Sequence, residues 1–185
     1  MTRIFIARHG EPESSSTIPQ TNWPLSRFGR NQADYLADRL REFGSLNVIS
    51  GPAARSKETA EFAAKKLGKN VKIDPRFGEA LPPRGADMEA WLEQTFSFQT
   101  PVYWNQLDAN LNKWRNDNLQ AVRELKEPSV IFTQFTNINA IFGAALRMEN
   151  TAVCRPDLAS LTEFSVVNGD IRLVIDGKEA VGPNE

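Results

Sequence analysis

The only histidine of this 185-residue chain, His9, comes directly after an apolar run, residues 4–7, that predicts a strand. Ligands of parallel α/β sheets bind beyond the carboxyl ends of the strands, so this position favours a functional histidine over one that simply lies on the surface. Its neighbours suit an anion. Arg8 offers a planar guanidinium to a phosphate, and Gly10 lacks a Cβ atom, so a bound oxyanion can approach the backbone closely. The segment therefore predicts an anion site with an imidazole beside it.

A second arginine, Arg55, stands in a similar place. Residues 46–50 predict another strand, and residues 50–55 lead from it into a helix. Taken alone, Arg55 would more often be a solvated charge on a helix. Two arginines at strand ends, together with the unpaired N–H groups of a helix N-terminus, make an anion site.

These residues need a sheet to hold them, and short β-rich runs do alternate with longer segments of helical spacing. That alternation is typical of an α/β domain with a largely parallel sheet. Residues 164–167 and 173–175 flank the turn signal Asn168-Gly169-Asp170 and predict a hairpin at a sheet edge. The remaining predicted strands are residues 4–7, 46–50, 71–74 and 130–133.

Two helices are predicted in the first half of the chain. The first follows Ser26, which suits an N-cap, and comes to an end by Gly44. The second spans residues 54–67, and Gly68 marks its end.

Two more helices are predicted in the second half. A long one carries an apolar stripe over residues 103–125 that is broken only at polar Asn118, and the next buries apolar residues between 138 and Leu146. Residues 80–101 contain Leu-Pro-Pro-Arg-Gly and break any regular element. We expect a single domain over residues 1–185, with an insertion around residues 80–104 that can lean over the site as a lid.

Composition excludes several classes of function. Lys and Arg total 22 against 23 Asp and Glu, a net charge of −1, so no overall attraction draws the chain to nucleic acid or to an anionic membrane. With one cysteine, Cys154, and one histidine, neither an intramolecular disulfide nor a cysteine- and histidine-rich zinc site can form. No signal-peptide core and no run of 18 apolar residues is visible. We expect a cytoplasmic protein that needs no metal or cofactor.

Common catalytic signatures are absent as well. No glycine-rich loop ends in Gly-Lys-Ser/Thr, no Gly-x-Gly-x-x-Gly follows a strand, and Gly-x-Ser-x-Gly does not occur. A nucleotide cradle or an α/β-hydrolase serine is therefore not expected.

Three segments together resemble the histidine phosphatase superfamily, also called the phosphoglycerate mutase-like family. Residues 8–11 read Arg-His-Gly-Glu and match its Arg-His-Gly signature. Residues 25–33 read LSRFGRNQA, similar to its Leu-Thr/Ser-x-x-Gly-x-x-Gln-Ala segment, and residues 50–61 read SGPAARSKETAE, similar to its Ser-x-x-x-x-Arg-x-x-x-Thr-Ala-Glu segment. The resemblance implies a three-layer α/β sandwich with a mostly parallel central sheet flanked by helices.

The resemblance also implies roles for individual residues. His9 would attack a phosphoryl group and form a phosphohistidine that water hydrolyses, while Arg8 and Arg55 would hold the phosphate. Glu79 stands where the family places the acid that protonates the leaving group, and partial burial would raise its pKa into a useful range. Glu11 is the competing candidate for that role. The expected ligand is a small phosphorylated molecule.

The chain departs from the family pattern at the end of the fourth core strand. Thr133-Gln134-Phe135 stands where the family usually has Ser-His-Gly, and no other histidine can substitute. Gln134 can still donate a hydrogen bond to a phosphoryl oxygen, but an amide carries no charge. Charge-assisted hydrogen bonds contribute about 1.5–3 kcal/mol and neutral ones about 0.5–1.5, so the exchange lowers the rate roughly tenfold.

A second departure lies at Ser15, which falls where the mutase branch often has an asparagine, so Ser15 is only a candidate for substrate binding. A small phosphatase fits the sequence better than a mutase. Two alternatives stay open. A pseudoenzyme would bind a phosphorylated ligand without turnover, and an interaction module would present the aromatic side chains of Trp91, Phe96, Phe98, Tyr103 and Trp104. Neither the substrate nor the oligomeric state can be predicted.

Overall fold

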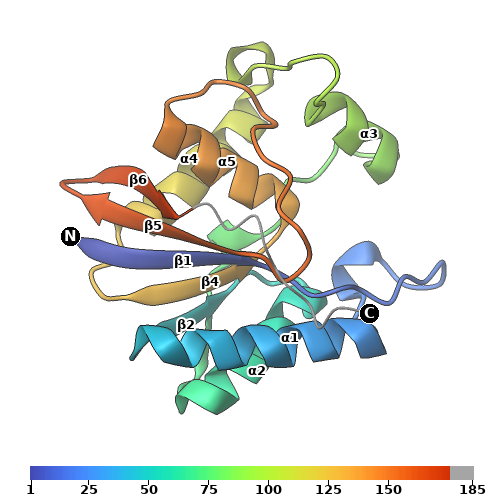
Figure 1. The fold of residues 1–185 in the computed structure, drawn as a ribbon. Coiled ribbons are helices and arrows are strands. Elements are labelled where there is room, and N and C mark those ends of the chain that lie inside the picture. Colours follow the sequence, from blue (N-terminus) through green and yellow to red (C-terminus); the bar gives the residue numbers. More distant parts are fainter. Residues whose placement is uncertain (176–185) are drawn as a thin grey trace.

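A six-stranded sheet in the order β3-β2-β4-β1-β5-β6 forms the middle layer of the computed structural model, which describes residues 1–175 (Figure 1). Neighbouring strands from β3 to β1 are parallel, whereas β5 pairs with β1 and β6 with β5 in the antiparallel sense. The strands are β1 (Thr2–Arg8), β2 (Asn47–Ser50), β3 (Val71–Ile73), β4 (Ser129–Thr133), β5 (Leu161–Val167) and β6 (Asp170–Ile175). The mostly parallel sheet is confirmed, as is the hairpin at its edge.

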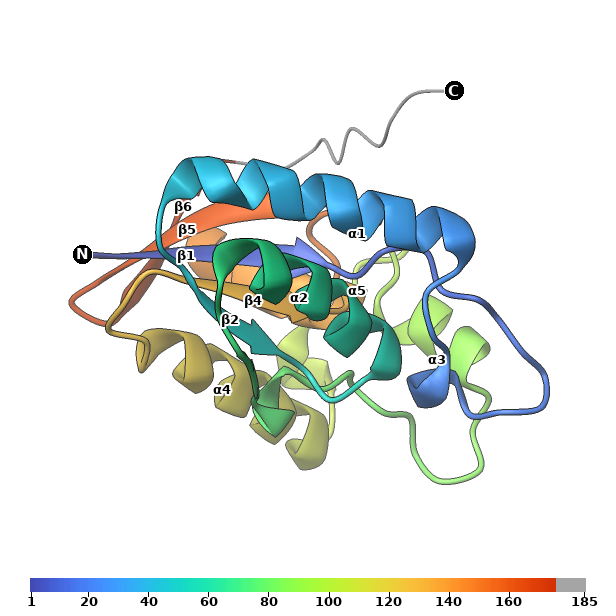
Figure 2. The ribbon, with the colours of Figure 1, turned by 90° about the horizontal axis from the view of Figure 1, so that it is seen from below.

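Helices cover both faces of this sheet, which confirms the α/β fold class. In Figures 1 and 2, α1 (Arg27–Leu40) and α2 (Ala54–Leu67) lie on one face, and α4 (Ala109–Arg123) and α5 (Phe135–Leu146) lie on the other. Side chains of β1 alternate between the two resulting cores, as the pleat of a strand requires. Ile4 and Ile6 belong to the core under α4 and α5, and Phe5 and Ala7 to the core under α1 and α2.

The ends of the first two helices agree with the sequence signals. Ser26 caps α1 by accepting a hydrogen bond from the Gly29 N–H, as expected of a serine at this position. A 3-10 turn, Arg41–Phe43, follows α1 before Gly44. Gly68 ends α2 in the left-handed conformation, with φ at 65°.

The third predicted helix begins later than its apolar stripe, residues 103–125, indicates. Helix α4 begins at Ala109 because the Asp108 side chain accepts hydrogen bonds from two N–H groups of the first turn, and Trp104–Gln106 forms a separate 3-10 turn. Asn118, predicted as a break in the apolar face, is fully buried on it. The predicted burial of Leu146 is also wrong, because this last residue of α5 is 44% exposed.

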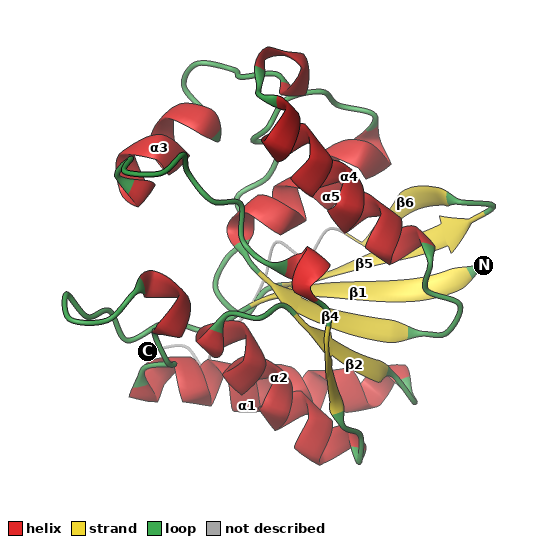
Figure 3. Cartoon of the chain, turned by 180° about the vertical axis from the view of Figure 1, so that it is seen from behind, coloured by secondary structure: helices red, strands yellow, loops and turns green. Residues whose placement is uncertain are grey.

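An additional helix, α3 (Met88–Thr95), lies in the segment that the sequence left without regular structure. Asp87 caps it through a hydrogen bond from the Ala90 N–H. Figures 2 and 3 show α3 beyond the carboxyl ends of the parallel strands, at the same end of the sheet as the loop that follows β1.

Aromatic side chains connect this segment to the helices above the sheet. The ring of Phe96 contacts those of Trp91, Trp104 and Phe135 edge to face, with centroids 6.0 to 6.3 Å apart. Phe96 and Trp104 are buried, at 3% and 1% exposed. These two side chains therefore belong to a core. The hypothesis that they form part of an exposed contact surface is wrong for Phe96 and Trp104.

No helix within residues 1–175 is long and apolar enough to cross a membrane.

Candidate active site

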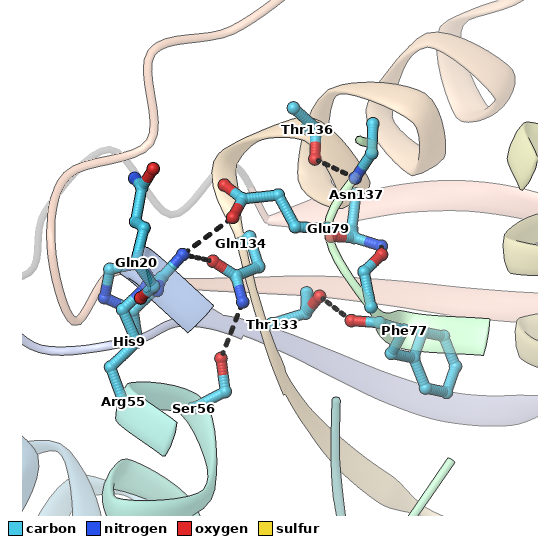
Figure 4. A network of polar contacts seen from close by, with 12 residues as sticks. His9, Gln20, Arg55, Ser56, Phe77, Glu79, Thr133, Gln134, Thr136 and Asn137 are labelled. Carbon is cyan, nitrogen blue, oxygen red and sulfur yellow. Dashed lines mark hydrogen bonds and ion pairs between the residues drawn. The ribbon is translucent and has the colours of Figure 1, made fainter. Parts of the chain in front are cut away.

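His9 is held in one orientation just beyond the end of β1. Its Nδ1 lies 2.7 Å from the carbonyl oxygen of Gly10, and its Nε2 lies 3.1 Å from Nε of Arg55 (Figure 4). An arginine Nε can only donate, so Nε2 accepts and Nδ1 carries the proton that is donated to Gly10. Burial, and then the positive charge of Arg55, lower the pKa of His9 well below its usual value. The imidazole is therefore neutral, with a lone pair on Nε2.

Arg55, in the first turn of α2, is the centre of the site. It is 2% exposed, and each nitrogen of its guanidinium has a partner. Nη1 donates to the Gln20 carbonyl at 2.6 Å, and Nη2 donates to Glu79 at 2.8 Å and to the side-chain oxygen of Gln134. One cation thus gathers a histidine and three oxygen atoms.

Glu79 follows β3 and a 3-10 turn, Pro75–Phe77, and its carboxylate forms a buried ion pair with Arg55. Burial raises the pKa of Glu79 more than the positive charges of Arg55 and Arg8 lower it. A carboxyl group with a raised pKa can hold a proton in mildly acidic solution, as a general acid must.

Gln134 directly follows β4 and is fully buried. Its amide oxygen faces Arg55, and its amide nitrogen lies 3.5 Å from the Ser56 hydroxyl. As the parallel register of β1 and β4 requires, Gln134 lies beside His9, whose backbone N–H donates to the Thr133 carbonyl.

Arg8, the last residue of β1, adds a second cation. Its Nη1 donates to the Pro156 carbonyl at 2.8 Å, and its guanidinium carbon lies 5.9 Å from the centroid of the Phe135 ring. Its Nε is buried and finds no hydrogen-bond partner among the residues described. Burial and the nearby charge of Arg55 lower the pKa of Arg8. A buried donor without an acceptor, next to a second cation, favours binding of an anion.

The three sequence motifs pack against one another, which explains several of their residues. Gly10 approaches Gly29 of α1 so closely that a Cβ atom would lie 2.5 Å from the Gly29 carbonyl oxygen. The Gly10 N–H donates to the Thr59 hydroxyl, and Thr59 donates back to the Arg55 carbonyl. The close approach that Gly10 allows is therefore one between backbone segments, and through Thr59 it links the histidine motif to the helix that carries Arg55.

Two sequence candidates lie outside the Arg55 network. Glu11 accepts a hydrogen bond from the Ser26 hydroxyl at 2.7 Å, at the start of α1. The Ser15 hydroxyl contacts that of Thr17 at 2.8 Å in the loop between β1 and α1. Among the described residues, the hydrogen-bond partners of His9 and Arg55 include neither of these side chains.

Two residues of the site, Gln20 and Ser56, were not predicted from the sequence. Gln20 takes part through its backbone carbonyl, a role that no side-chain pattern signals. Ser56 faces Gln134 from the residue after Arg55, and its only signal was its place inside the second arginine motif. Among residues 1–175, no group of three side chains suited to holding a metal ion occurs.

The arrangement defines a class of protein: an α/β protein with a neutral histidine, one buried and one partly buried arginine, and a carboxyl of raised pKa at the carboxyl ends of its parallel strands. The chain matches the sequence profile of the histidine phosphatase superfamily (branch 1) over residues 4–175, and it belongs to that family.

Curated relatives match only part of the chain. The probable phosphoglycerate mutases GpmB of Escherichia fergusonii and Yersinia enterocolitica are 33% and 34% identical to it over 82 residues. Each match covers 43% of this chain and 38% of the relative, so the chain spans about two-fifths of the length of these proteins.

Solved structures match the fold over nearly the whole chain. Bacillus stearothermophilus YhfR superimposes with a TM-score of 0.76 at 18% identity, covering 97% of this chain and 98% of that one. A mycobacterial glucosyl-3-phosphoglycerate phosphatase gives 0.70 at 22% identity, with 96% and 98% covered. A phosphoserine phosphatase of Entamoeba histolytica gives 0.73 at 19% identity, with 98% and 100% covered. Membership of this family supports phosphoryl transfer or hydrolysis as the class of chemistry, and the solved structures support the fold.

Proposed function

We propose that the protein hydrolyses a phosphomonoester through a phosphohistidine at His9. The observation that carries this proposal is the pair of hydrogen bonds to the ring: Nδ1 donates to the Gly10 carbonyl, so Nε2 carries no proton and its lone pair accepts from Arg55. A neutral imidazole of this tautomer is a competent nucleophile at neutral pH.

In the first step, Nε2 of His9 attacks phosphorus, a P–N bond forms and the P–O bond to the leaving group breaks. The proton of the Glu79 carboxyl goes to the departing oxygen. In the second step, water attacks phosphorus and the Glu79 carboxylate takes up its proton. The P–N bond breaks, and inorganic phosphate leaves with the histidine restored.

Arg8 and Arg55 hold the phosphoryl oxygens in this proposal. The Nε of Arg8 is buried without a partner among the described residues, so an incoming oxygen supplies an acceptor that it lacks. Arg55 already binds three oxygen atoms of the protein, from Gln20, Glu79 and Gln134, and phosphoryl oxygens can exchange with them. Two fixed cations offset the charge that develops on the transferring group.

Gln134 takes the place of the second histidine of the family in this account. Rotation of its side-chain amide, whose nitrogen now faces Ser56, would bring a neutral donor to a phosphoryl oxygen. A neutral donor stabilises the transition state less than an imidazolium, so we expect slow turnover.

The ligand is a small phosphorylated molecule, and residues 80–104 act as a lid over it. In Figures 1 and 2, α3 of this segment lies beyond the strand ends that carry His9 and Gln134. The phosphoserine phosphatase of Entamoeba histolytica was solved with phosphoserine and with 3-phosphoglyceric acid, which supports a ligand of this size. A cytoplasmic location fits the single cysteine, Cys154, because no intramolecular disulfide needs an oxidising compartment.

Hydrolysis of 4-nitrophenyl phosphate between pH 5 and 8 tests the proposal. The wild type should turn over, His9→Ala should lose activity, and Arg41→Ala, an exposed change at the end of α1, should keep it. Equal activity of the wild type and His9→Ala would overturn the mechanism.

A binding-only protein is the second candidate, and the neutral Gln134 is the observation that favours it. Its signature would be a wild type that is as inactive as His9→Ala and still binds inorganic phosphate.

A further inference from the structure

The turn that carries Glu79 is held by side chains from elements far away in sequence. The Phe77 carbonyl accepts a hydrogen bond from the Thr133 hydroxyl at 2.9 Å, a contact visible in Figure 4. The next carbonyl, that of Gly78, accepts two, from Trp114 Nε1 and from Asn137 Nδ2, each at 2.9 Å. Two donors on the peptide that directly precedes Glu79 fix the direction from which its side chain leaves the backbone.

The burial of Asn137 is unusual for a polar residue that only stabilises the fold, because one of its side-chain polar atoms lacks a partner within the described residues. It is fully buried in the first turns of α5, and its Oδ1 has no hydrogen-bond partner among residues 1–175. A buried acceptor without a donor destabilises a protein, so an apolar side chain would serve a core better here. The side-chain amide makes one hydrogen bond, in which Nδ2 donates to the Gly78 carbonyl.

Asn137 also lies three residues after Gln134 on the same segment. Thr133 and Asn137 hold the turn of Glu79, and Gln134 between them contacts Arg55, which in turn pairs with Glu79. Residues 133–137 therefore set the distance between the Glu79 carboxyl group and Arg55.

We propose that Asn137 is a positioning residue that holds Glu79 for proton transfer, through its hydrogen bond to the Gly78 carbonyl. The inference rests on the proposed phosphatase function, in which Glu79 protonates the leaving group. A general acid must lie within about 2.6–3.2 Å of the oxygen that it protonates, so a small rotation of the Gly78–Glu79 peptide removes it from reach.

The effect on substrates depends on the leaving group. An alkyl phosphate needs a proton on its departing oxygen, whereas 4-nitrophenyl phosphate releases a stabilised phenolate without one. For Asn137→Ala we expect kcat/KM, which covers only the steps through release of the leaving group, to fall about tenfold or more for an alkyl phosphate and about twofold or less for 4-nitrophenyl phosphate, since a general acid contributes about 10²–10⁴-fold.

Asn139→Ala is the matched control. Asn139 is an equally buried asparagine of α5, but its amide oxygen accepts from the Val153 and Cys154 N–H groups and its nitrogen donates to the Phe135 carbonyl. None of these hydrogen bonds of Asn139 involves the turn that carries Glu79. This variant should change kcat/KM for both substrates by the same factor. An equal loss on both substrates in Asn137→Ala would overturn the inference.

Titration of the Glu79 carboxyl by ¹³C NMR tests the same inference without activity. We expect the raised pKa of Glu79 to move toward its ordinary range in Asn137→Ala and to stay raised in Asn139→Ala, and an unmoved value would overturn the positioning role. If the wild type hydrolyses neither substrate, the proposed function fails while this titration still decides the role of Asn137. Should Asn137→Ala not fold, Trp114→Phe removes the other donor to Gly78 and takes its place in both measurements.

Discussion

Nε of Arg55 donates to Nε2 of His9 at 3.1 Å, so the ring nitrogen that faces the site is the one without a proton. The contact orients the imidazole, and burial together with the positive charge of Arg55 lowers the pKa of His9 and keeps the ring neutral. In the proposed mechanism, the lone pair on Nε2 attacks the phosphoryl group that the two arginines bind.

The first prediction concerns the ionisation of His9. Burial and Arg55 lower its pKa, so the imidazole should stay neutral as the pH falls through 6.5, where an exposed histidine would gain its proton. Because the chain has one histidine, a single imidazole signal in ¹H NMR reports this titration without assignment. A midpoint near 6.5 would contradict the buried, arginine-facing ring.

The same shift predicts how stability changes with pH. Below pH 6.5 the unfolded chain binds a proton at His9 that the folded chain does not, so the free energy of unfolding should fall by up to about 1.4 kcal/mol per pH unit from this group. This contribution is complete above pH 6.5 and is lost as the pH decreases. Urea unfolding at several pH values should show it in the wild type, and His9→Gln should lose that part of the slope.

Much of the fold could be predicted from the sequence because its signals are local. The strand runs, the Ser26 cap, the Gly68 stop and the Asn168-Gly169 turn each depend on a few adjacent residues, and each is found in the structure. Helix α3 and the start of α4 were missed because their caps, Asp87 and Asp108, lie in segments whose aromatic residues pack by tertiary contact.

The site could be predicted in part for the same reason. Arg8, His9 and Arg55 stand in motifs, and the structure brings His9, Arg55, Glu79 and Gln134 into contact. The contact of Arg55 with the Gln20 carbonyl and the hydrogen bond from Asn137 to Gly78 could not be predicted. A backbone acceptor and a hydrogen bond between distant residues leave no pattern in the sequence.

Activity should decrease as the pH rises for substrates with poor leaving groups. Burial raises the pKa of Glu79, and in the first step the carboxyl acts only while it is protonated, so kcat/KM for an alkyl phosphate should fall as the pH passes through that pKa. Glu79→Gln should lower kcat/KM for an alkyl phosphate about 10²-fold or more and abolish this dependence. An alkaline decrease that persists in Glu79→Gln would assign it to another group.

Restoring a histidine at position 134 should speed the reaction. An imidazolium gives a charge-assisted hydrogen bond where the amide gives a neutral one, so we expect Gln134→His to raise kcat about tenfold. The Phe135 ring packs against those of Phe96 and Phe98, with centroids 6.3 and 6.2 Å away. Gln134→Leu, which has no donor, should lower kcat, and equal rates in all three proteins would exclude position 134 from the phosphate site.

Inorganic phosphate should stabilise the protein through the two arginines. A ligand at 100 times its Kd adds about 2.7 kcal/mol to the free energy of unfolding, which appears as a rise in Tm. We expect this rise to be lost in Arg8→Gln and kept in Arg41→Gln, a charge-matched change at an exposed site. The same Tm shift in both variants would locate the phosphate elsewhere.

Trapping the phosphorylated protein tests the central claim most directly. The wild type is mixed with a phosphomonoester, denatured in alkali within the first turnovers, and analysed by ³¹P NMR and by mass spectrometry of its peptides. We predict an acid-labile, alkali-stable phosphoramidate on His9 that is absent from His9→Ala. Hydrolysis by the wild type with no phosphoryl group on His9 at any time would contradict the account.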